Sequence, residues 1–240
     1  MTQMLKYLIS ASIAAMTLLL VISCDSDNLD EKDEKSPFNP KLTYGVTNDV
    51  GGNEYQTIQI GNQVWMAENL RSAGDHLSFV RKENPSYVEL YGYLYSWESA
   101  MAGCPDGWHL PTLDEWEELF NYLGGKDVAG SALKSSGKNH WYRNKTGTNT
   151  SGFSALAAGG GFNLDVNYDG RIDSEDIEWA NTYKSGKRRA FFWTATKINN
   201  QVATIQLNDD YEPTIDGKKV VINYSADDGF LYMSVRCVKD

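Results

Sequence analysis

The stretch "LDVNYDGRIDSED" (residues 164–176) carries oxygen-bearing side chains at alternating positions. Asp165, Asn167 and Asp169 alternate with other residues, and Gly170 follows where a tight loop must turn. Calcium is a hard cation that takes about six to eight oxygen ligands, and alternating side chains on a tight loop converge on one centre. The stretch therefore predicts a calcium-binding loop over residues 165–176. A metal-free acidic turn is the alternative.

The spacing of these residues also resembles that of an EF-hand or dockerin loop. The resemblance implies a backbone carbonyl ligand from Arg171, with Asp173 and Asp176 closing the coordination shell. Asp176 is shorter than the glutamate that usually ends an EF-hand loop, and a dockerin needs a second such loop that this chain lacks. We expect one structural Ca²⁺ and no cohesin partner.

The remaining reactive side chains do not form a catalytic set. His76, His109 and His140 stand apart, without the spacing that a transition-metal site needs. The sequence also lacks a G-x-S-x-G nucleophile elbow and a phosphate-cradling glycine loop. We therefore expect His109 to pack or to form hydrogen bonds, and we do not expect the chain to be an enzyme.

The N-terminus carries an export signal. Lys6 precedes an apolar run over residues 7–22 that ends at Ser23 and Cys24. A basic start and a short apolar core ending in small residues predict a secretory signal peptide over residues 1–23. The end of this run, "VISC", resembles a bacterial lipobox, which implies that Cys24 is acylated and becomes the new N-terminus. An uncleaved membrane anchor is the alternative, and in both cases the rest of the chain faces an extracytoplasmic space.

An acidic segment follows the cysteine. Residues 25–36 contain six acidic residues and two lysines, with Leu29 as the one apolar side chain. Such a segment cannot bury enough apolar surface to offset its ordering entropy, so we expect a disordered tether over residues 24–43. Its position resembles the surface-export signal of Bacteroidota lipoproteins. The resemblance implies an outer membrane lipoprotein exposed on the cell surface, with the periplasmic face as the alternative.

If Cys24 carries the lipid, Cys104 and Cys237 are the two cysteines that remain. Two cysteines in an oxidising compartment usually pair. The sequence therefore predicts a Cys104–Cys237 disulfide that would close nearly the whole folded domain. Two free thiols are the alternative.

Residues 44–240 are enough for one domain with a substantial core. Alternating apolar and polar residues over 55–70, on both sides of Gly61 and Asn62, predict a β-hairpin. The net charge of −10 argues against a nucleic acid partner, whose phosphates require a basic surface.

Two helices are predicted after the hairpin, over residues 95–103 and 111–125. The second begins with a capping box from Thr112 and Glu115. Strands return from residue 190 onward, whereas "DIEWANTYK" (176–184) indicates a helical turn. Strands, then helices, then strands predict an α+β domain.

Seven blocks of sequence carry a resemblance to a known family. They are, in order, "GNEYQTIQIGNQVWMAENL", "YGYLYSWESAM", "CPDGWHLPTLDEWEEL", "AGSALKSS", "NTSGFSALAAG", "FFWTAT" and "SVRCV". Together they resemble the Fibrobacter succinogenes major paralogous domain over nearly all of residues 45–238. The pattern is also similar, more distantly, to the formylglycine-generating and C-type lectin-like folds. It implies a C-type lectin-like domain of small looped antiparallel sheets flanked by two helices, with its termini close together.

The sugar site of calcium-dependent C-type lectins does not carry over. Glu212 and Pro213 are followed by Thr214 instead of an amide or acid, and no Trp-Asn-Asp triplet comes later. Aromatic rings can bind glycans through their flat apolar faces. Trp179, in an insertion over residues 161–189, is therefore a candidate ligand-binding residue, together with Tyr183 and Tyr211.

These features predict a non-catalytic binding module, anchored to the membrane through an N-terminal lipid. Its expected ligand is a glycan or a partner protein of the cell envelope. A structural subunit of a cell-surface assembly is the alternative.

Overall fold

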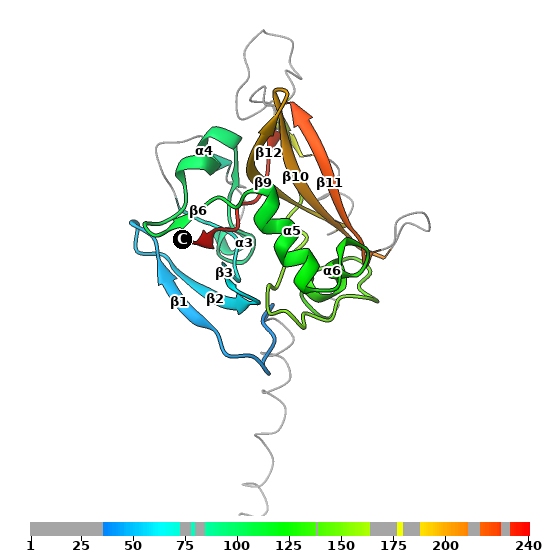
Figure 1. The fold of residues 1–240 in the computed structure, drawn as a ribbon. Helices are drawn as coiled ribbons and strands as arrows, with labels where there is room; N and C mark the ends of the chain where they lie inside the picture. The colour runs from blue at the N-terminus through cyan, green and yellow to red at the C-terminus, as the bar shows by residue number, and fades with distance from the viewer. Residues whose placement is uncertain are drawn as a thin grey trace, which may run out of the picture. The chain divides into compact units, whose positions relative to one another are not determined.

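The computed structural model describes residues 36–72, 78–79, 85–137, 139–163, 177–179, 188–210, 217–226 and 231–240. The folded unit spans Pro37–Asp240 (Figure 1). It includes residues 37–43, which the sequence assigned to the tether. Cys24, His76, the calcium loop over 165–176, Tyr183 and Tyr211 lie outside the described residues.

The first sheet joins the two ends of the domain. Its strand order is β1 (Gly45–Asn48), β2 (Glu54–Ile60), β3 (Gln63–Met66), β13 (Val238–Lys239) and β6 (Trp108–His109), and all neighbours are antiparallel. The β2–β3 hairpin turns at Gly61, whose φ of 62° is readily adopted by glycine, and this confirms the predicted hairpin. The last strand pairs with β3, so both ends of the domain belong to one sheet (Figure 1).

The second sheet has the order β11 (Val220–Ala226), β10 (Gln201–Asn208) and β9 (Arg189–Ile198). Asn199 and Asn200 connect β9 to β10 with φ values of 50° and 61°. A two-residue hairpin turn of this hand requires positive φ at both positions, and asparagine tolerates that conformation. The strands predicted from residue 190 onward are confirmed.

Two smaller sheets contain the other strands of the described residues. One has the order β12 (Leu231–Tyr232), β7 (Gly161–Asn163) and β8 (Ile177–Trp179), and the other pairs β4 (Ser78–Phe79) with β5 (Leu94–Tyr95). The prediction of a helical turn over 176–184 is wrong at residues 177–179, which pair with β7. A single helical turn is marginally stable because nucleating a helix is unfavourable. A short strand is stabilised by the backbone hydrogen bonds that it forms with the neighbouring strand.

Helices occupy a small part of the chain. Those of the described residues are α3 (Pro85–Tyr91), α4 (Trp97–Ala102), α5 (Leu113–Tyr122) and α6 (Lys126–Leu133). Helices α4 and α5 confirm the two predicted ones, and the capping box of Thr112 and Glu115 is present at the start of α5. Among the described residues, no helix is both long and apolar enough to cross a bilayer.

Helices α3 and α6 were not predicted from the sequence. Helix α6 has Gly125 as its N-cap and contains Gly130, and glycine is a poor helix former, so local propensity gave little signal. Gly130 lies against the backbone of Lys218, where an added Cβ would come within 2.7 Å of the carbonyl oxygen. Close packing of α6 onto the segment before β11 therefore explains the glycine.

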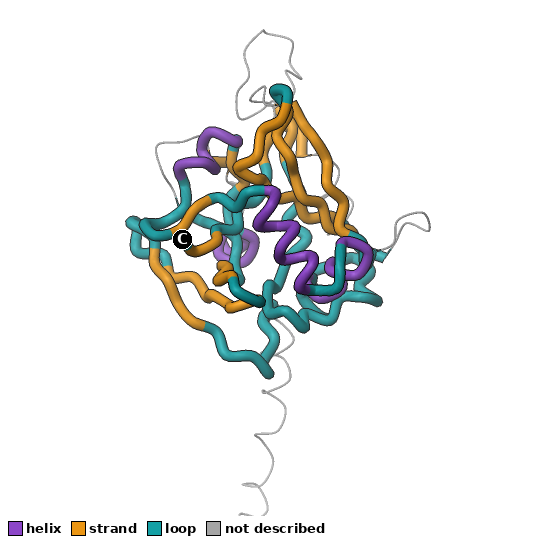
Figure 2. Tube along the Cα trace, in the orientation of Figure 1, coloured by secondary structure: helices purple, strands orange, loops and turns teal. Residues whose placement is uncertain are grey.

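An aromatic cluster forms the centre of the main core. Trp116 of α5 lies 4.7 Å from Trp65 of β3, 5.5 Å from Phe153 and 5.6 Å from Phe192 of β9, measured between ring centroids. All four side chains are buried. Helix α5 therefore packs one apolar face against residues of both larger sheets. Loops connect most of the short strands (Figure 2), and the fold is a mixed α/β domain with few helices and antiparallel sheets.

A disulfide links Cys104, after α4, to Cys237, before β13, with an S–S distance of 2.06 Å. This is the pairing that the sequence predicted. The bond ties the segment between α4 and β6 to the last strand of the first sheet.

Candidate functional site: a cavity between three motif segments

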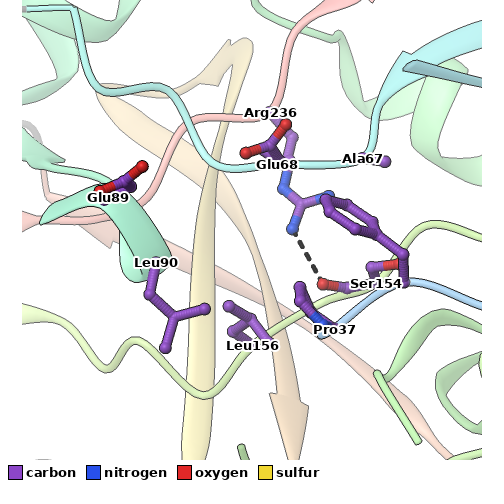
Figure 3. A pocket seen from close by; sticks show the side chains of 9 residues that line it. Pro37, Ala67, Glu68, Glu89, Leu90, Ser154, Leu156 and Arg236 are labelled. Atoms are coloured by element: carbon purple, nitrogen blue, oxygen red, sulfur yellow. Dashed lines mark hydrogen bonds between the residues drawn. The ribbon is translucent and has the colours of Figure 1, made fainter. Parts of the chain in front are cut away.

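A cavity of about 240 Å³ opens where segments far apart in the sequence meet (Figure 3). Pro37 and Phe38 lie at the start of the folded unit, Ala67 and Glu68 follow β3, and Glu89 and Leu90 come from α3. Ser154, Leu156 and Arg236 complete the lining. Residues 67–68, 154–156 and 236 belong to the blocks "WMAENL", "NTSGFSALAAG" and "SVRCV", so three of the family blocks converge on this cavity.

Arg236 is a buried cation at the cavity, with 1% of its surface exposed. Its Nε donates to Asn69 Oδ1 at 2.6 Å, and its Nη1 donates to the carbonyls of Met66 (3.2 Å) and Phe153. Its Nη2 donates to the Ser154 carbonyl at 3.2 Å. Four of the five N–H groups of the guanidinium therefore go to protein acceptors.

The guanidinium stays charged despite its burial. Desolvation lowers the pKa of Arg236 to about 9, and the nearby carboxylate of Glu68 opposes that shift. The ring centroid of Phe153 lies 4.6 Å from the guanidinium carbon, at a distance that allows a cation–π interaction. At neutral pH the cavity thus has a fixed positive charge that is enclosed by carbonyl oxygens and an aromatic ring.

Asn149 connects the start of the folded unit to the same cavity. Its Nδ2 donates to the Pro37 carbonyl and to Ser154 Oγ, each at 2.9 Å, and its Oδ1 accepts from the Ser154 amide at 3.0 Å. Ser154 has a φ of 57°, an uncommon conformation for a residue with a side chain. Such a conformation persists when surrounding bonds fix it, as the Asn149 amide does here.

Two carboxylates also line the cavity. Glu68 accepts hydrogen bonds from the Gln56 amide and from Arg71 Nη1, the latter at 3.1 Å. Glu89 lies on α3 and is exposed, and within the described part of the chain its carboxylate has no hydrogen bond or ion pair. Glu89 is therefore the acidic group of the cavity that a ligand could engage without breaking an existing contact.

The walls between these polar groups are apolar. Leu156 is 3% exposed and belongs to a small cluster with Tyr91 and Ala158, against which Leu90 packs. Leu90 and Leu156 face one another in Figure 3. Phe38 packs against the main core, with its ring centroid 5.2 Å from that of Tyr44. The cavity thus combines leucine walls with carboxylates and one buried arginine.

His109 forms hydrogen bonds, as the sequence predicted, away from the cavity. Its Nδ1 lies 2.6 Å from Asp240 Oδ1 and its Nε2 lies 2.8 Å from Glu115 Oε1. A carboxylate only accepts hydrogen bonds, so both contacts require the doubly protonated ring. Burial lowers the pKa of His109, but the bonds to Asp240 and Glu115 outweigh it and hold that pKa above its ordinary value.

The other predicted site residues fall largely outside the described structure. Trp179 lies in β8 by its backbone, and its side chain is not described. The structure does not describe the six calcium-loop residues, Tyr183 or Tyr211 either. Their roles as calcium or ligand-binding residues therefore stay predictions from the sequence.

Sequence reasoning missed Arg236, Asn149 and the cavity itself. One signal was available, because a charged arginine stands between the apolar residues Val235 and Cys237 in "SVRCV". Charged residues are rarely buried unless they are paired, so such an arginine marks a buried polar network.

The fold and the cavity define a class of protein, namely a small disulfide-linked α/β domain in which separated sequence blocks line a cavity. The family profile described as the Fibrobacter succinogenes major domain matches residues 58–239, and the chain belongs to this family. Comparison with curated proteins and with solved structures finds no match.

Proposed function

We propose that this chain is a non-catalytic, lipid-anchored binding module of the cell envelope, and that its ligand occupies the cavity beside Arg236. The ligand is a glycan or a partner protein. The observation that carries the proposal is the preformed cavity, whose lining is held by a buried hydrogen-bond network. Rigid sites bind at lower entropic cost, because their side chains are already ordered before the ligand arrives.

The chemistry of the lining supports binding over catalysis. The Ser154 hydroxyl donates to the Gly152 carbonyl and accepts from Asn149, so it is not set up as a nucleophile. The Glu68 carboxylate is occupied by Gln56 and Arg71. Four of the five N–H groups of the Arg236 guanidinium donate hydrogen bonds to protein acceptors. The hydrogen bonds of Ser154, Glu68 and Arg236 therefore fix the shape of the cavity, and none of these three side chains is positioned as a nucleophile or a general base.

Three finer features belong to the same proposal. A C-type lectin-like fold is supported by the short antiparallel sheets and by a last strand that returns beside β3. One structural Ca²⁺ in the loop over 165–176 is supported by its ligand spacing and by the pairing of Asn163 with Ile177, which brings the loop's two ends together. Acylation of Cys24 and display on the cell surface are supported by the sequence before residue 44.

A cavity-filling variant tests the proposal. The full chain, purified in detergent, is applied to a glycan array and to solubilised envelope proteins, with and without calcium. We expect specific binding that Leu90→Trp abolishes, because the larger ring occupies the cavity. Val128→Trp is the matched control, since Val128 is an exposed apolar residue on another helix, α6.

Binding that survives Leu90→Trp would reject the cavity as the ligand site. A silent array, together with envelope proteins that co-purify equally with wild type and Leu90→Trp, would favour the alternative of a structural subunit in a cell-surface assembly.

A further inference from the structure

We infer that the cavity beside Arg236 accepts a neutral sugar unit of a glycan and excludes acidic sugars. The inference rests on the proposed function and adds the chemical class of the ligand. It follows from the cavity's size, its charge balance, its hydrogen-bonding capacity and its apolar walls.

The size of the cavity limits the ligand to one small group. Its volume is about 240 Å³, below the roughly 300–1,000 Å³ of pockets that hold drug-sized ligands. One sugar ring or one amino-acid side chain is the appropriate scale. A longer glycan would place one unit in the cavity and the rest outside it.

Among the described residues, the charges that line the cavity or pair with its lining balance one another. Glu68 and Glu89 supply two negative charges, whereas Arg236 and the Arg71 that pairs with Glu68 supply two positive charges. A charged ligand that enters the cavity loses part of its hydration, and that loss opposes binding. With local charges that sum to zero, no net attraction repays that cost. The balance therefore favours an uncharged ligand over an ammonium or a carboxylate.

The free hydrogen-bonding groups are mainly acceptors. Arg236 uses four N–H groups on Asn69 and on backbone carbonyls, so at most one is left for a ligand. An anion is normally held by two parallel N–H groups of an arginine, and that arrangement is not available here. Within the described residues, by contrast, no donor is bonded to the Glu89 carboxylate. A ligand with several hydroxyl donors fits this distribution, and an acidic sugar does not.

The apolar walls fit the carbon-bound face of a sugar ring. Leu90 and Leu156 supply adjoining aliphatic surface, and Leu90 lies beside Glu89 on α3 (Figure 3). A sugar ring has C–H groups on its faces and hydroxyl groups around its edge. Its faces can therefore contact the leucines while its hydroxyls donate to Glu89.

Paired sugars test the inference. The full chain is titrated by calorimetry with methyl glucoside, methyl galactoside, methyl mannoside and methyl xyloside, and with glucuronic and galacturonic acids as acidic counterparts. We expect at least one neutral glycoside to bind tenfold or more tightly than either acid. Glu89→Gln should weaken binding of the neutral glycoside, because the amide replaces one acceptor oxygen with a donor. It should also narrow the affinity difference between neutral and acidic sugars, because the described charges at the cavity then sum to a positive value. Glu118→Gln, an exposed glutamate of α5, should change neither value.

Each outcome separates the two proposals. Binding that Leu90→Trp abolishes but that prefers an acid, an amine or a peptide overturns the neutral-sugar inference and leaves the binding function intact. Binding of a neutral sugar that Leu90→Trp leaves unchanged overturns both assignments to this cavity. If no sugar of either kind shows binding heat at millimolar concentration, the neutral-sugar inference is rejected.

Discussion

Arg236 shows how one buried charge can organise an irregular fold. Its acceptors are the Met66 carbonyl at the end of β3, the carbonyls of Phe153 and Ser154, and the side chain of Asn69. Asn69 also donates to the Tyr91 carbonyl at 2.8 Å. Backbone carbonyls outside regular strands need donors when they are buried. A planar guanidinium can supply several donors in different directions at once. Arg236 therefore supplies side-chain hydrogen bonds to backbone carbonyls that would otherwise need donors from a neighbouring strand.

Replacing Arg236 should destabilise the domain strongly. In Arg236→Lys the charge remains, but the ammonium cannot reach the Asn69 side chain and all three carbonyls together. Each buried acceptor left without a donor costs about 1–3 kcal/mol, so we expect the free energy of unfolding to fall by at least that much, measured by denaturant titration. Lys219→Gln, which removes an ion pair between exposed side chains of Lys219 and Asp127, should have little effect. An Arg236→Lys domain as stable as wild type would show that the network is dispensable.

His109 should make stability depend on pH. Its pKa is higher in the folded protein than in the unfolded chain. The stabilisation is therefore complete below the unfolded value of about 6.5 and is lost as pH rises through the folded value. We expect the denaturation midpoint of wild type to exceed that of His109→Gln by the largest margin near pH 6 and by the smallest margin near pH 9. The denaturation midpoint of Glu118→Gln should depend on pH in the same way as that of wild type. The same pH dependence for His109→Gln would contradict the prediction.

The β7–β8 pair is the element that positions the predicted calcium loop. Register pairs Asn163 with Ile177, so the chain leaves and re-enters the sheet at neighbouring positions. An EF-hand loop is instead flanked by two helices. The described flanks are strands, so the resemblance to an EF-hand is limited to the ligand spacing over 165–176 and does not extend to flanking helices.

Calcium should stabilise the domain through this loop. Several aspartates close together repel one another without metal, and a ligand that binds the folded state alone stabilises it by RT ln(1 + [Ca²⁺]/Kd). We expect a Kd of roughly 10⁻⁶ to 10⁻³ M by calorimetry, and a lower melting temperature in EDTA. Asp165→Ala should lose both effects, whereas Asp106→Ala, an exposed acid outside the loop, should retain them. An absence of calcium heat at millimolar concentration, with no effect of EDTA, would leave only an acidic turn.

The disulfide acts on the whole domain because it closes a long loop. Cys104 and Cys237 are separated by 133 positions. A bridge across a loop of about that length stabilises by roughly 4–5 kcal/mol in the chain-entropy model, and often by less in practice. We expect the double variant Cys104→Ser, Cys237→Ser to unfold at lower denaturant concentration, and reduced wild type to match it. Two freely alkylatable thiols in the native, unreduced protein would refute the bond.

Anchoring of the whole molecule is predicted to depend on Cys24. Metabolic labelling with a palmitate analogue should mark the wild-type chain and not Cys24→Ala, because the thiol is the acylation site implied by "VISC". Label that persists in the variant would contradict the assignment. Protease treatment of intact cells should cleave the domain if it faces outward, and protection would place it on the periplasmic side.

Local sequence was sufficient for features governed by short-range chemistry. The hairpin at Gly61 follows from period-two alternation around a glycine turn, and α5 follows from a capping box and one apolar face. The pairing of Cys104 with Cys237 follows from counting cysteines in an oxidising compartment. Each of these depends on neighbours in the sequence or on composition, so no knowledge of distant contacts was needed.

The tertiary structure decided the features that depend on distant partners. Arg236 bonds to residues that lie 82 to 170 positions away, and a sequence pattern does not identify them. The strand at Ile177–Trp179 exists because β7 offers a ladder that outweighs a marginal helical turn. The cavity likewise exists only where segments beginning at residues 37, 67, 89 and 154 meet Arg236. Burial and pairing across the fold, and not local propensity, therefore determine the candidate site.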